Sequence, residues 1–210
     1  MRAKLLPLAC SLAAALASGC STVPGFEPAE TRRAVIATEQ GDIVVELRPA
    51  EAPVTTANFI ALARAGVLDG GSFYRTVSAR NDRPDAVPID IIQGGVGFDG
   101  AEGVAPIAHE TTAQTGLSHT PGAISMARDE VGTASSEFFI VINDARSLDS
   151  GPGGRNPDEA GYAVFGYVIE GMDVVDAIWN SPAGDPEAPE GFEAQWLAPP
   201  VRIETVRMQN

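Results

Sequence analysis

The chain has almost no cysteine, lysine or histidine. Its two cysteines, Cys10 and Cys20, lie in the first twenty residues, and its one lysine is Lys4. The rest of the chain therefore offers no thiol for a disulfide or a nucleophile and no amine for a Schiff base. The two histidines, His109 and His119, stand ten positions apart without a nearby cysteine, which matches no zinc-site spacing. Thiol and Schiff-base chemistry are excluded, and we predict neither a metal nor another cofactor.

Positive charge is also scarce. The 210 residues contain 14 Lys and Arg against 28 Asp and Glu, a formal net charge of −14. Without Arg2 and Lys4, which stand at the extreme N-terminus, the net charge falls to about −16. Such a surface repels nucleic acid and anionic lipid head groups. The composition therefore predicts no nucleic-acid partner and no membrane binding through a basic patch.

The apolar run at residues 5–17 is too short to span a bilayer, which takes roughly 20 residues. Because Arg2 and Lys4 precede it, we interpret it as the core of a signal peptide. It ends in Leu-Ala-Ser-Gly-Cys at 16–20, which resembles the lipobox of bacterial lipoproteins. The resemblance implies lipidation of Cys20 and a membrane anchor in the cell envelope, at the outer membrane. The alternative is an ordinary secretory signal that leaves a soluble periplasmic protein.

These features divide the chain into three parts. Residues 1–19 form the predicted signal peptide, and residues 20–33 form a Pro- and Gly-bearing tether behind the lipidated cysteine. Residues 34–210 are enough for one domain with a sizeable core, and they show no internal repeat.

The pattern within this domain is mainly β. Residues 34–38 and 42–47 flank a Gly-bearing turn and predict a hairpin. A helix is expected from Pro53 to Gly66, and a second at 172–179. Further strands are expected at 72–77, 88–93, 122–127, 138–142, 163–168 and 201–208, with polar or Pro/Gly-rich loops at 78–87 and 181–200. About eight short strands and two helices favour a closed antiparallel barrel with the helices over its ends.

Several short motifs recur in a fixed order along the domain. They are Phe73-Tyr74-Arg75, Ile92-Gln93-Gly94-Gly95, the runs 122–128 and 135–140, Leu148-Asp149, and the runs 161–166 and 171–175. Together they resemble the cyclophilins, especially the bacterial periplasmic branch, over nearly all of residues 34–210. The resemblance implies an eight-stranded antiparallel barrel capped by two helices. It also implies a monomeric peptidyl-prolyl cis-trans isomerase that acts on proline-containing, unfolded or partly folded envelope proteins.

The chemistry of such an enzyme needs little. An X–Pro bond rotates slowly because amide resonance imposes a barrier of roughly 18–20 kcal/mol. Rotation makes and breaks no covalent bond, so it requires no nucleophile, metal or cofactor. A site needs an apolar pocket for the proline ring and a donor that bonds the prolyl nitrogen as it becomes pyramidal. A fixed guanidinium suits this role because charge-assisted hydrogen bonds strengthen where water is excluded.

By resemblance, Arg75 is this catalytic donor, and Gln93 holds the substrate backbone and helps to orient Arg75. The other residues that match groove positions of the family are expected to bind substrate: Phe73, Ile91, Met126, Ala127, Arg128, Glu137, Phe139, Leu148 and Tyr162. For the apolar members of this set the alternative is plain core packing. For Arg75 it is a surface arginine on an edge strand.

The chain departs from the family between Arg75 and Gln93. The separation of 18 positions is longer than is usual in the family, so residues 78–87 are interpreted as an insertion. Asp90 stands where the family has a pocket phenylalanine. We expect either that Ile89 or Ile91 fills this space or that the pocket is shallower.

Two further departures lie later in the chain. Glu137 replaces a glutamine and brings an acid near the groove. Ser147 replaces an aromatic residue that contacts cyclosporin, a cyclic peptide that inhibits many cyclophilins, so weak inhibition by cyclosporin is expected.

Three alternative functions compete with this interpretation. A catalytically weak peptide-binding or chaperone module would keep the groove and lose turnover, as the insertion, Asp90 and Ser147 would favour. A purely structural lipoprotein would give Arg75 and Gln93 no reason to accompany an apolar pocket. A serine hydrolase is disfavoured because Ser125 lacks the Gly-x-Ser-x-Gly pattern of a nucleophile elbow.

Overall fold

The computed structural model describes residues 32–209. The predicted signal peptide, the predicted lipidation site Cys20 and residues 20–31 of the predicted tether lie outside the described residues. Between residues 32 and 209, no helix has the length and apolar character that crossing a bilayer requires.

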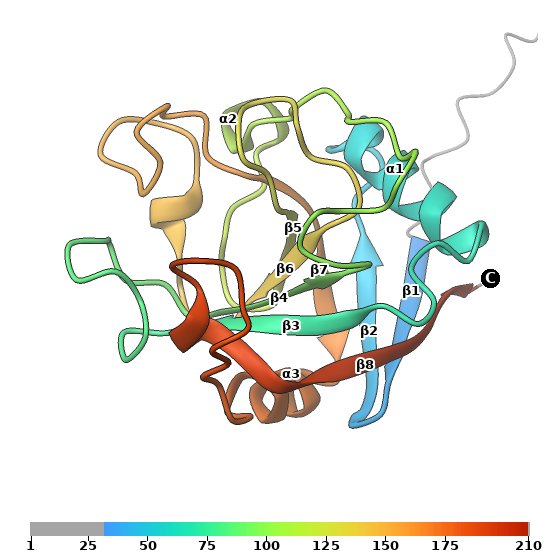
Figure 1. The fold of residues 1–210 in the computed structure, drawn as a ribbon. Coiled ribbons are helices and arrows are strands. Elements are labelled where there is room, and N and C mark those ends of the chain that lie inside the picture. The colour runs from blue at the N-terminus through green and yellow to red at the C-terminus, as the bar shows by residue number, and fades with distance from the viewer. Residues whose placement is uncertain (1–31, 210) are drawn as a thin grey trace, which may run out of the picture.

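Eight antiparallel strands close into a barrel (Figure 1). Around the barrel they follow the order β1-β2-β7-β5-β6-β4-β3-β8. The strands are β1 (Arg32–Thr38), β2 (Gly41–Leu47), β3 (Ser72–Val77), β4 (Ile91–Gly95), β5 (Ala123–Met126), β6 (Phe138–Val141), β7 (Ala163–Glu170) and β8 (Trp196–Gln209). The predicted fold class, a mainly β closed barrel of eight antiparallel strands, is confirmed.

Two of the three α-helices match the prediction. α1 (Pro53–Arg64) and α3 (Met172–Trp179) lie at opposite ends of the barrel (Figure 1). Pro53 opens α1, and the Glu110 carboxylate accepts hydrogen bonds from the next two backbone N–H groups, at Val54 (3.1 Å) and Thr55 (2.8 Å). These bonds satisfy donors that have no partner within a first helical turn.

The single-turn helix α2 (Thr112–Thr115) was not predicted. Its signal was present in the sequence as a capping box between Thr111 and Gln114, followed by Gly116 in the left-handed conformation. Two 3-10 turns, η1 (Arg146–Leu148) and η2 (Glu193–Gln195), complete the elements.

Three strands begin two or more residues away from their predicted first residues. β1 begins at Arg32, inside the expected tether, because Arg32 and Arg33 continue the ladder with β2. β4 begins at Ile91 rather than residue 88, after a stretch that opens with Pro88. β8 begins at Trp196, inside the expected loop at 181–200.

The β8 error has a physical cause. Proline cannot donate to a strand ladder, so Pro199 and Pro200 predicted a loop. In the structure β8 pairs with β3 on both sides of these prolines, through Trp196 with Arg75 and Val201 with Phe73. The prolines occupy the irregular stretch between the two paired segments.

The barrel interior is filled by aromatic and branched aliphatic side chains. Phe59 from α1 packs edge-on against Phe138 from β6, and Phe73 from β3 packs edge-on against the same ring, each at 5.8 Å between ring centres. Phe165 from β7 lies 5.2 Å from Phe59. These four rings are fully buried and form the centre of the core.

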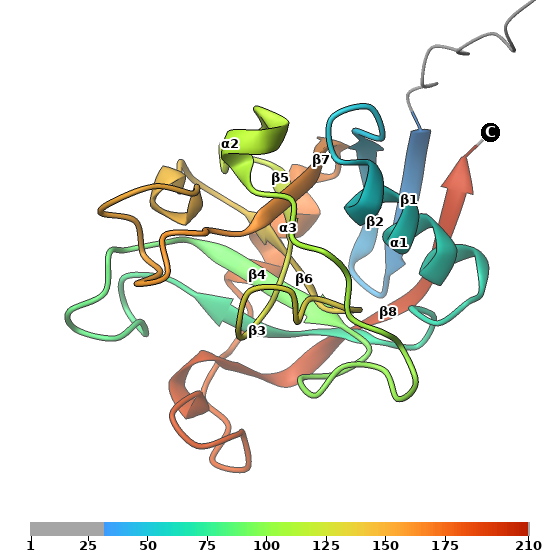
Figure 2. The same cartoon turned by 90° about the horizontal axis from the view of Figure 1, so that it is seen from above.

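A second, smaller apolar cluster lies on the outer face of the barrel. Because alternate strand residues point to opposite faces, Phe138 points inward while Phe139 points outward, and Ile92 and Ile91 divide in the same way. Loops that follow β3 and β6 extend beside this face, as Figure 2 shows from above. The outer cluster is where the candidate site lies.

Candidate active site

A cavity of about 480 Å³ opens on the outer face of β3, β4 and β6. Of the residues expected from the sequence, all but Phe73 and Met126 line it: Arg75, Ile91, Gln93, Ala127, Arg128, Glu137, Phe139, Leu148 and Tyr162. Positions up to 87 residues apart, from Arg75 to Tyr162, therefore come together at one place, as a single groove requires.

Phe73 is not a substrate-binding residue in this structure, because it is 0% exposed and packs inside the barrel. Arg75, two positions later, lines the outer cavity, although residues two apart on a regular strand share a face. The register explains the difference. Phe73 pairs with Gly94 and Arg75 pairs with Gln93, so Tyr74 is an extra residue in β3. This β-bulge places both Tyr74 and Arg75 on the outer side.

Met126 is also a correction. It is 1% exposed and belongs to the interior core, together with Ile124 two positions before it on β5. The residue between them, Ser125, points to the outer side and bonds His119. The alternation of β5 therefore gives Met126 to the core, which was the competing interpretation for the apolar site residues.

Arg75 is held by two side-chain amides. Its Nη1 donates to Oε1 of Gln93 at 2.7 Å, and its Nε donates to Oε1 of Gln195 at 2.7 Å. The ring of Phe192 lies 4.7 Å from the guanidinium carbon, at a distance typical of a cation–π contact. Within residues 32–209, Nη2 of Arg75 makes no hydrogen bond and remains for a ligand in the cavity.

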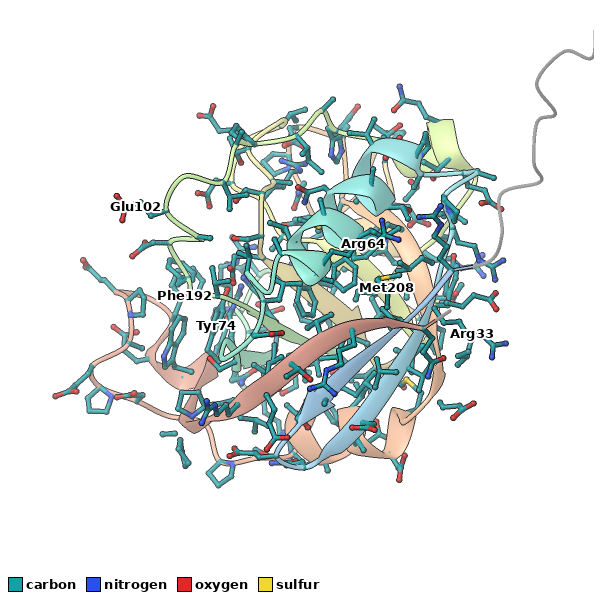
Figure 3. The ribbon with its side chains drawn as sticks, turned by 90° about the vertical axis from the view of Figure 1, so that its right-hand side faces the viewer. Arg33, Arg64, Tyr74, Glu102, Phe192 and Met208 are labelled. Atoms are coloured by element: carbon teal, nitrogen blue, oxygen red, sulfur yellow. The ribbon has the colours of Figure 1, made fainter. Side chains whose placement is uncertain are left out.

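Gln195 and Phe192 were missed by the sequence analysis. Both lie in the 181–200 segment, about which the sequence predicted only a loop. Gln195 is 5% exposed, and its Nε2 donates to the backbone oxygen of Asn81 at 2.9 Å. Figure 3 shows Phe192 beside Tyr74, on the side of the molecule away from Arg33 and Met208. No local motif marks a contact across 120 positions.

Arg75 keeps its charge at neutral pH. Burial lowers the pKa of Arg75 to about 10, because removal from water disfavours the charged guanidinium. That pKa still leaves it cationic at pH 7. Its partners are neutral amides, so the charge is oriented without being neutralised, and it acts across a cavity partly lined by apolar side chains.

A chain of hydrogen bonds fixes Gln93. Its Nε2 donates to the Tyr74 hydroxyl at 3.0 Å, and that hydroxyl donates to Oε2 of Glu137 at 2.8 Å. Burial, with the nearby Glu137 charge, raises the pKa of Tyr74 well above its usual value, so the hydroxyl keeps its proton. The Tyr74 proton goes to Glu137, so Tyr74 accepts from the Gln93 nitrogen. The Gln93 oxygen is thereby presented to Arg75.

Glu137 brings an acid to the groove, but its carboxylate is occupied. Besides Tyr74, it accepts from the backbone N–H groups of Val96 (3.0 Å) and Gly97 (3.3 Å). Burial raises the pKa of Glu137, and these hydrogen bonds oppose that rise. A Cβ at Gly95 would clash with the Glu137 carboxylate, so glycine is required at this position. Glu137 therefore anchors the loop after β4 and holds Tyr74.

The apolar part of the cavity is formed by the side chains of Ile89, Ile91, Phe139, Leu148 and Tyr162. The Phe139 and Tyr162 rings meet edge-on at 5.3 Å. The sequence predicted that Ile89 or Ile91 would fill the place of the missing phenylalanine, or that the pocket would be shallower. In the structure, both isoleucines line the cavity. Asp90 between them accepts from the Asn143 side chain at 2.8 Å instead.

Behind this pocket, the buried His119 and Ser125 and the half-buried Asp149 form a trio that the sequence pattern did not predict. His119 contacts Oδ1 of Asp149 through Nδ1 at 2.6 Å and Oγ of Ser125 through Nε2 at 3.0 Å. The order resembles a hydrolase triad, but Ser125 is 0% exposed and lines no cavity wall. A serine without access to substrate does not support hydrolysis. The His119 ring instead stacks 5.8 Å from Phe139 and supports the pocket.

Arg128 forms a wall of the groove rather than a free charge. Its guanidinium makes a two-pronged contact with Asp158, at 2.8 and 3.0 Å, and Nε donates to the backbone oxygen of Gly161 at 2.9 Å. It also lies 5.1 Å from the Tyr162 ring centre. Ala127 precedes it along the same wall. Within residues 32–209, no group of three or more His, Cys, Asp or Glu side chains is placed to hold a metal.

Comparison with known proteins agrees with this geometry. Residues 33–208 match the family described as cyclophilin type peptidyl-prolyl cis-trans isomerase/CLD. The chain is 37% identical over 176 residues to peptidyl-prolyl cis-trans isomerase cyp18 of Streptomyces antibioticus, covering 81% of this chain and 95% of that protein. It is 34% identical over 178 residues to a peptidyl-prolyl cis-trans isomerase of Acinetobacter baylyi, covering 82% and 83%.

Solved structures show the same fold. The crystal structure of a Cryptosporidium parvum cyclophilin type peptidyl-prolyl cis-trans isomerase aligns with a TM-score of 0.64 at 21% sequence identity, over 86% of this chain and 98% of that one. A second crystal structure of that protein, in the presence of the dipeptide Ala-Pro, aligns with a TM-score of 0.63. The chain belongs to the cyclophilin-type peptidyl-prolyl cis-trans isomerase family.

Proposed function

We propose that this protein accelerates the cis–trans rotation of X–Pro bonds and that Arg75 stabilises the twisted amide. The observation that carries the proposal is the fixation of Arg75. Gln93 and Gln195 hold two of its three guanidinium nitrogens, and Nη2 remains beside a cavity whose apolar part is formed by residues such as Phe139 and Leu148. The names of the relatives support the same activity.

The mechanism follows from the electronic change during rotation. When the C–N bond twists, resonance is lost and the lone pair returns to the prolyl nitrogen. A cationic donor at that nitrogen binds the twisted amide more strongly than the planar one, which is the condition for catalysis. The apolar residues, led by Phe139 and Leu148, hold the proline ring while the Arg75 guanidinium donates. Lowering the barrier by about 7 kcal/mol would accelerate rotation on the order of 10⁵-fold.

The geometry also means that Arg75 needs little rearrangement when the substrate reacts. Arg75 is already oriented before a substrate binds, because Gln93 is fixed through Tyr74 and Gln195 is fixed through Asn81. Donors that need no rearrangement at the moment of reaction stabilise a transition state most effectively. Gln93 is therefore proposed to orient Arg75 and to hold the substrate backbone beside it.

We further propose that the clients are proline-containing, unfolded or partly folded proteins of the cell envelope, and that the protein acts as a monomer. The Leu-Ala-Ser-Gly-Cys sequence at 16–20 supports an outer-membrane lipid anchor on Cys20. A Cys20→Ser variant should leave the membrane fraction or accumulate as precursor, because serine has no thiol to carry the lipid. A singly acylated form should wash off more easily than the wild type, because stable anchoring takes more than one acyl chain. Mass spectrometry that finds an unmodified N-terminus downstream of Cys20 would refute the anchor.

A second candidate is a peptide-binding or chaperone module with little turnover. Ser147 favours it, since its side chain adds no aromatic surface to the cavity that Leu148 lines. The two candidates differ in one measurement. A binding module would bind Ala-Pro peptides without accelerating their isomerisation, whereas an isomerase would do both.

A protease-coupled assay on an Ala-Pro-Phe peptide tests the main proposal. The protein purified without residues 1–20 should accelerate isomerisation with no added metal or nucleotide. Arg75→Ala should lower kcat/KM by one to three orders of magnitude, or about 1.4–4 kcal/mol of transition-state stabilisation. Arg75→Lys keeps the charge but cannot reach both amides with a planar fork, so it should recover only part of the activity. Equal activity of wild type and Arg75→Ala would remove Arg75 from the mechanism.

A further inference from the structure

The arginines of this acidic chain are concentrated around one cavity. Residues 32–209 contain twelve arginines, and four of them line the candidate active site: Arg75, Arg83, Arg128 and Arg155. Two of these, Arg83 and Arg155, belong to segments with no assigned function, the inserted loop at 78–87 and the loop before β7. In a chain with a net charge of −14, such a local excess of guanidinium groups calls for a physical explanation.

Arg155 ties the inserted loop to the groove. Its Nη1 and Nη2 contact the two oxygens of Asp82 at 2.7 Å each, and both side chains are almost fully buried. Nη1 also donates to the backbone oxygen of Val87, and the Arg155 N–H donates to the oxygen of Ser147 at 2.6 Å. A two-pronged, buried contact of this kind fixes geometry as well as adding energy. The loop is therefore fastened at both ends of residues 82–87.

Arg83 follows immediately after this anchor. Its backbone N–H donates to Oδ1 of Asp82 at 2.8 Å, while its side chain is exposed and lines the cavity rim. Arg128 and Arg155 each have a carboxylate partner, Asp158 and Asp82. Arg83 makes no side-chain hydrogen bond or ion pair with any residue in 32–209. The rim therefore presents one guanidinium that is positioned by its backbone and free to bind.

The acidic residues of the cavity lie at its other end. The inserted loop leads into β4 at Ile91, whereas Asp99 follows the far end of β4 after Gly95, and Figure 2 shows the two loops leaving opposite ends of that strand. Asp129 lies in the loop before β6, whose first residue, Phe138, pairs with Gly94 at that same far end. Arg83 therefore lies near one end of the groove, and Asp99 and Asp129 lie near the other, where Arg128 is already paired with Asp158.

We propose that Arg83, held in place by the Asp82–Arg155 pair, forms a carboxylate-binding subsite next to the proline pocket. The preferred substrates are then X–Pro segments that carry Asp or Glu within a few residues of the proline, on the side that lies over the inserted loop. A guanidinium matches a carboxylate with two parallel hydrogen bonds, which a neutral side chain cannot reproduce. This inference rests on the proposed function, because it defines the substrate class of the same groove.

Peptides that differ by one charge test the subsite in the full chain, purified in mild detergent. Glu and Gln are compared at each of four positions, the two before the proline and the two after it, in a peptide whose other side chains are uncharged. At low salt, Glu at one position should raise kcat/KM about two- to fivefold over Gln, as expected for an exposed ion pair. The preference should fade at about 0.5 M salt, where exposed charges are screened.

Two matched variants locate the effect. Arg83→Gln should abolish the preference for Glu. Arg80→Gln removes a charge from the same loop, but Arg80 lies 5.5 Å over the Trp179 ring and does not line the cavity. It should keep both the preference and the activity on neutral peptides. Absence of a Glu preference at all four positions, or its persistence in Arg83→Gln, would overturn the subsite.

The outcomes separate this inference from the proposed function. Turnover of the Gln peptides without any preference for Glu would reject the subsite and leave the isomerase intact. If no peptide were turned over, the proposed function would fail, and fluorescence titration of the same peptides would still test the subsite. Wild type should bind the Glu peptide two- to fivefold more tightly than the Gln peptide, and Arg83→Gln should bind them equally.

Discussion

The inside and the outside of this barrel are built from adjacent residues with different tasks. Phe138 fills the interior beside Phe59, while Phe139, the next residue of β6, faces the outer cavity. The interior consists of apolar side chains that only need to fill volume. On the outer face, apolar side chains stand beside Arg75 and Gln93, whose orientation is fixed by hydrogen bonds. Stability and chemistry are therefore assigned to opposite faces of the same strands.

The comparison predicts the largest effect on stability inside the barrel. Phe59→Ala should lower the free energy of unfolding by about 3–5 kcal/mol, because it removes a ring from contact with Phe138 and Phe165 and leaves a cavity. Urea unfolding measures this loss. Turnover per folded molecule should stay near wild type, since Phe59 lines no part of the site. A collapse of turnover in folded Phe59→Ala would break the division between the two faces.

A large effect on ligand binding is expected at Ser147 on the outer face. Cyclosporin should inhibit the wild-type protein weakly, and Ser147→Trp should bind it some 30- to 150-fold more tightly with little change in turnover. The reason is area. An indole contact of about 100 Å² corresponds to about 2–3 kcal/mol of apolar burial. Nanomolar inhibition of the unmodified protein would show that other aromatic residues of the rim, such as Phe98 and Phe192, replace the contact.

A smaller effect is expected where the outer face positions Arg75. Gln195→Ala removes the acceptor of the Arg75 Nε and should lower kcat about 3- to 10-fold, with KM less affected. Gln195→Glu keeps an acceptor oxygen and should retain most of the activity. Steady-state kinetics on one peptide measures both. A rise in KM alone, with kcat unchanged, would mean that Gln195 contacts substrate rather than orienting Arg75.

The smallest effect concerns pH and the support behind the pocket. Burial lowers the pKa of His119 below its ordinary value of 6.5, although Asp149 opposes the shift. Near pH 6.5 the unfolded chain then binds a proton that the folded chain does not. The contribution of His119 to the free energy of unfolding is therefore complete above pH 6.5 and decreases as pH falls below it. Glu137, whose pKa burial raises, contributes with the opposite sign.

A comparison of wild type with His119→Gln isolates the contribution of His119 to the pH dependence of stability. The stability of wild type should decline from pH 7 to pH 5 more steeply than that of His119→Gln, which cannot titrate at this position. Urea titrations at several pH values give the two slopes. Parallel slopes would show that His119 is not held neutral in the folded protein.

Much of this molecule could be predicted from the sequence, and the failures have physical causes. Alternation along the strands and glycine-bearing turns predicted the barrel, and ordered motifs placed Arg75 and Gln93 in one cavity. Phe73 was assigned to the wrong face because one extra residue, Tyr74, shifts the alternation, and a bulge has no signature in a single strand. Gln195 was missed because its contact with Arg75 depends on how distant segments pack.

The central claim is that the outer face carries the chemistry while the interior carries the fold. Exchange NMR on Arg75→Ala with an Ala-Pro-Phe peptide tests it most directly, since one sample reports both properties. The account predicts that resonances of interior residues such as Ile124 and Phe165 keep their wild-type positions while the cis–trans exchange rate of the bound peptide falls about 10- to 1,000-fold. Undiminished exchange, or loss of the interior resonances together with exchange, would contradict it.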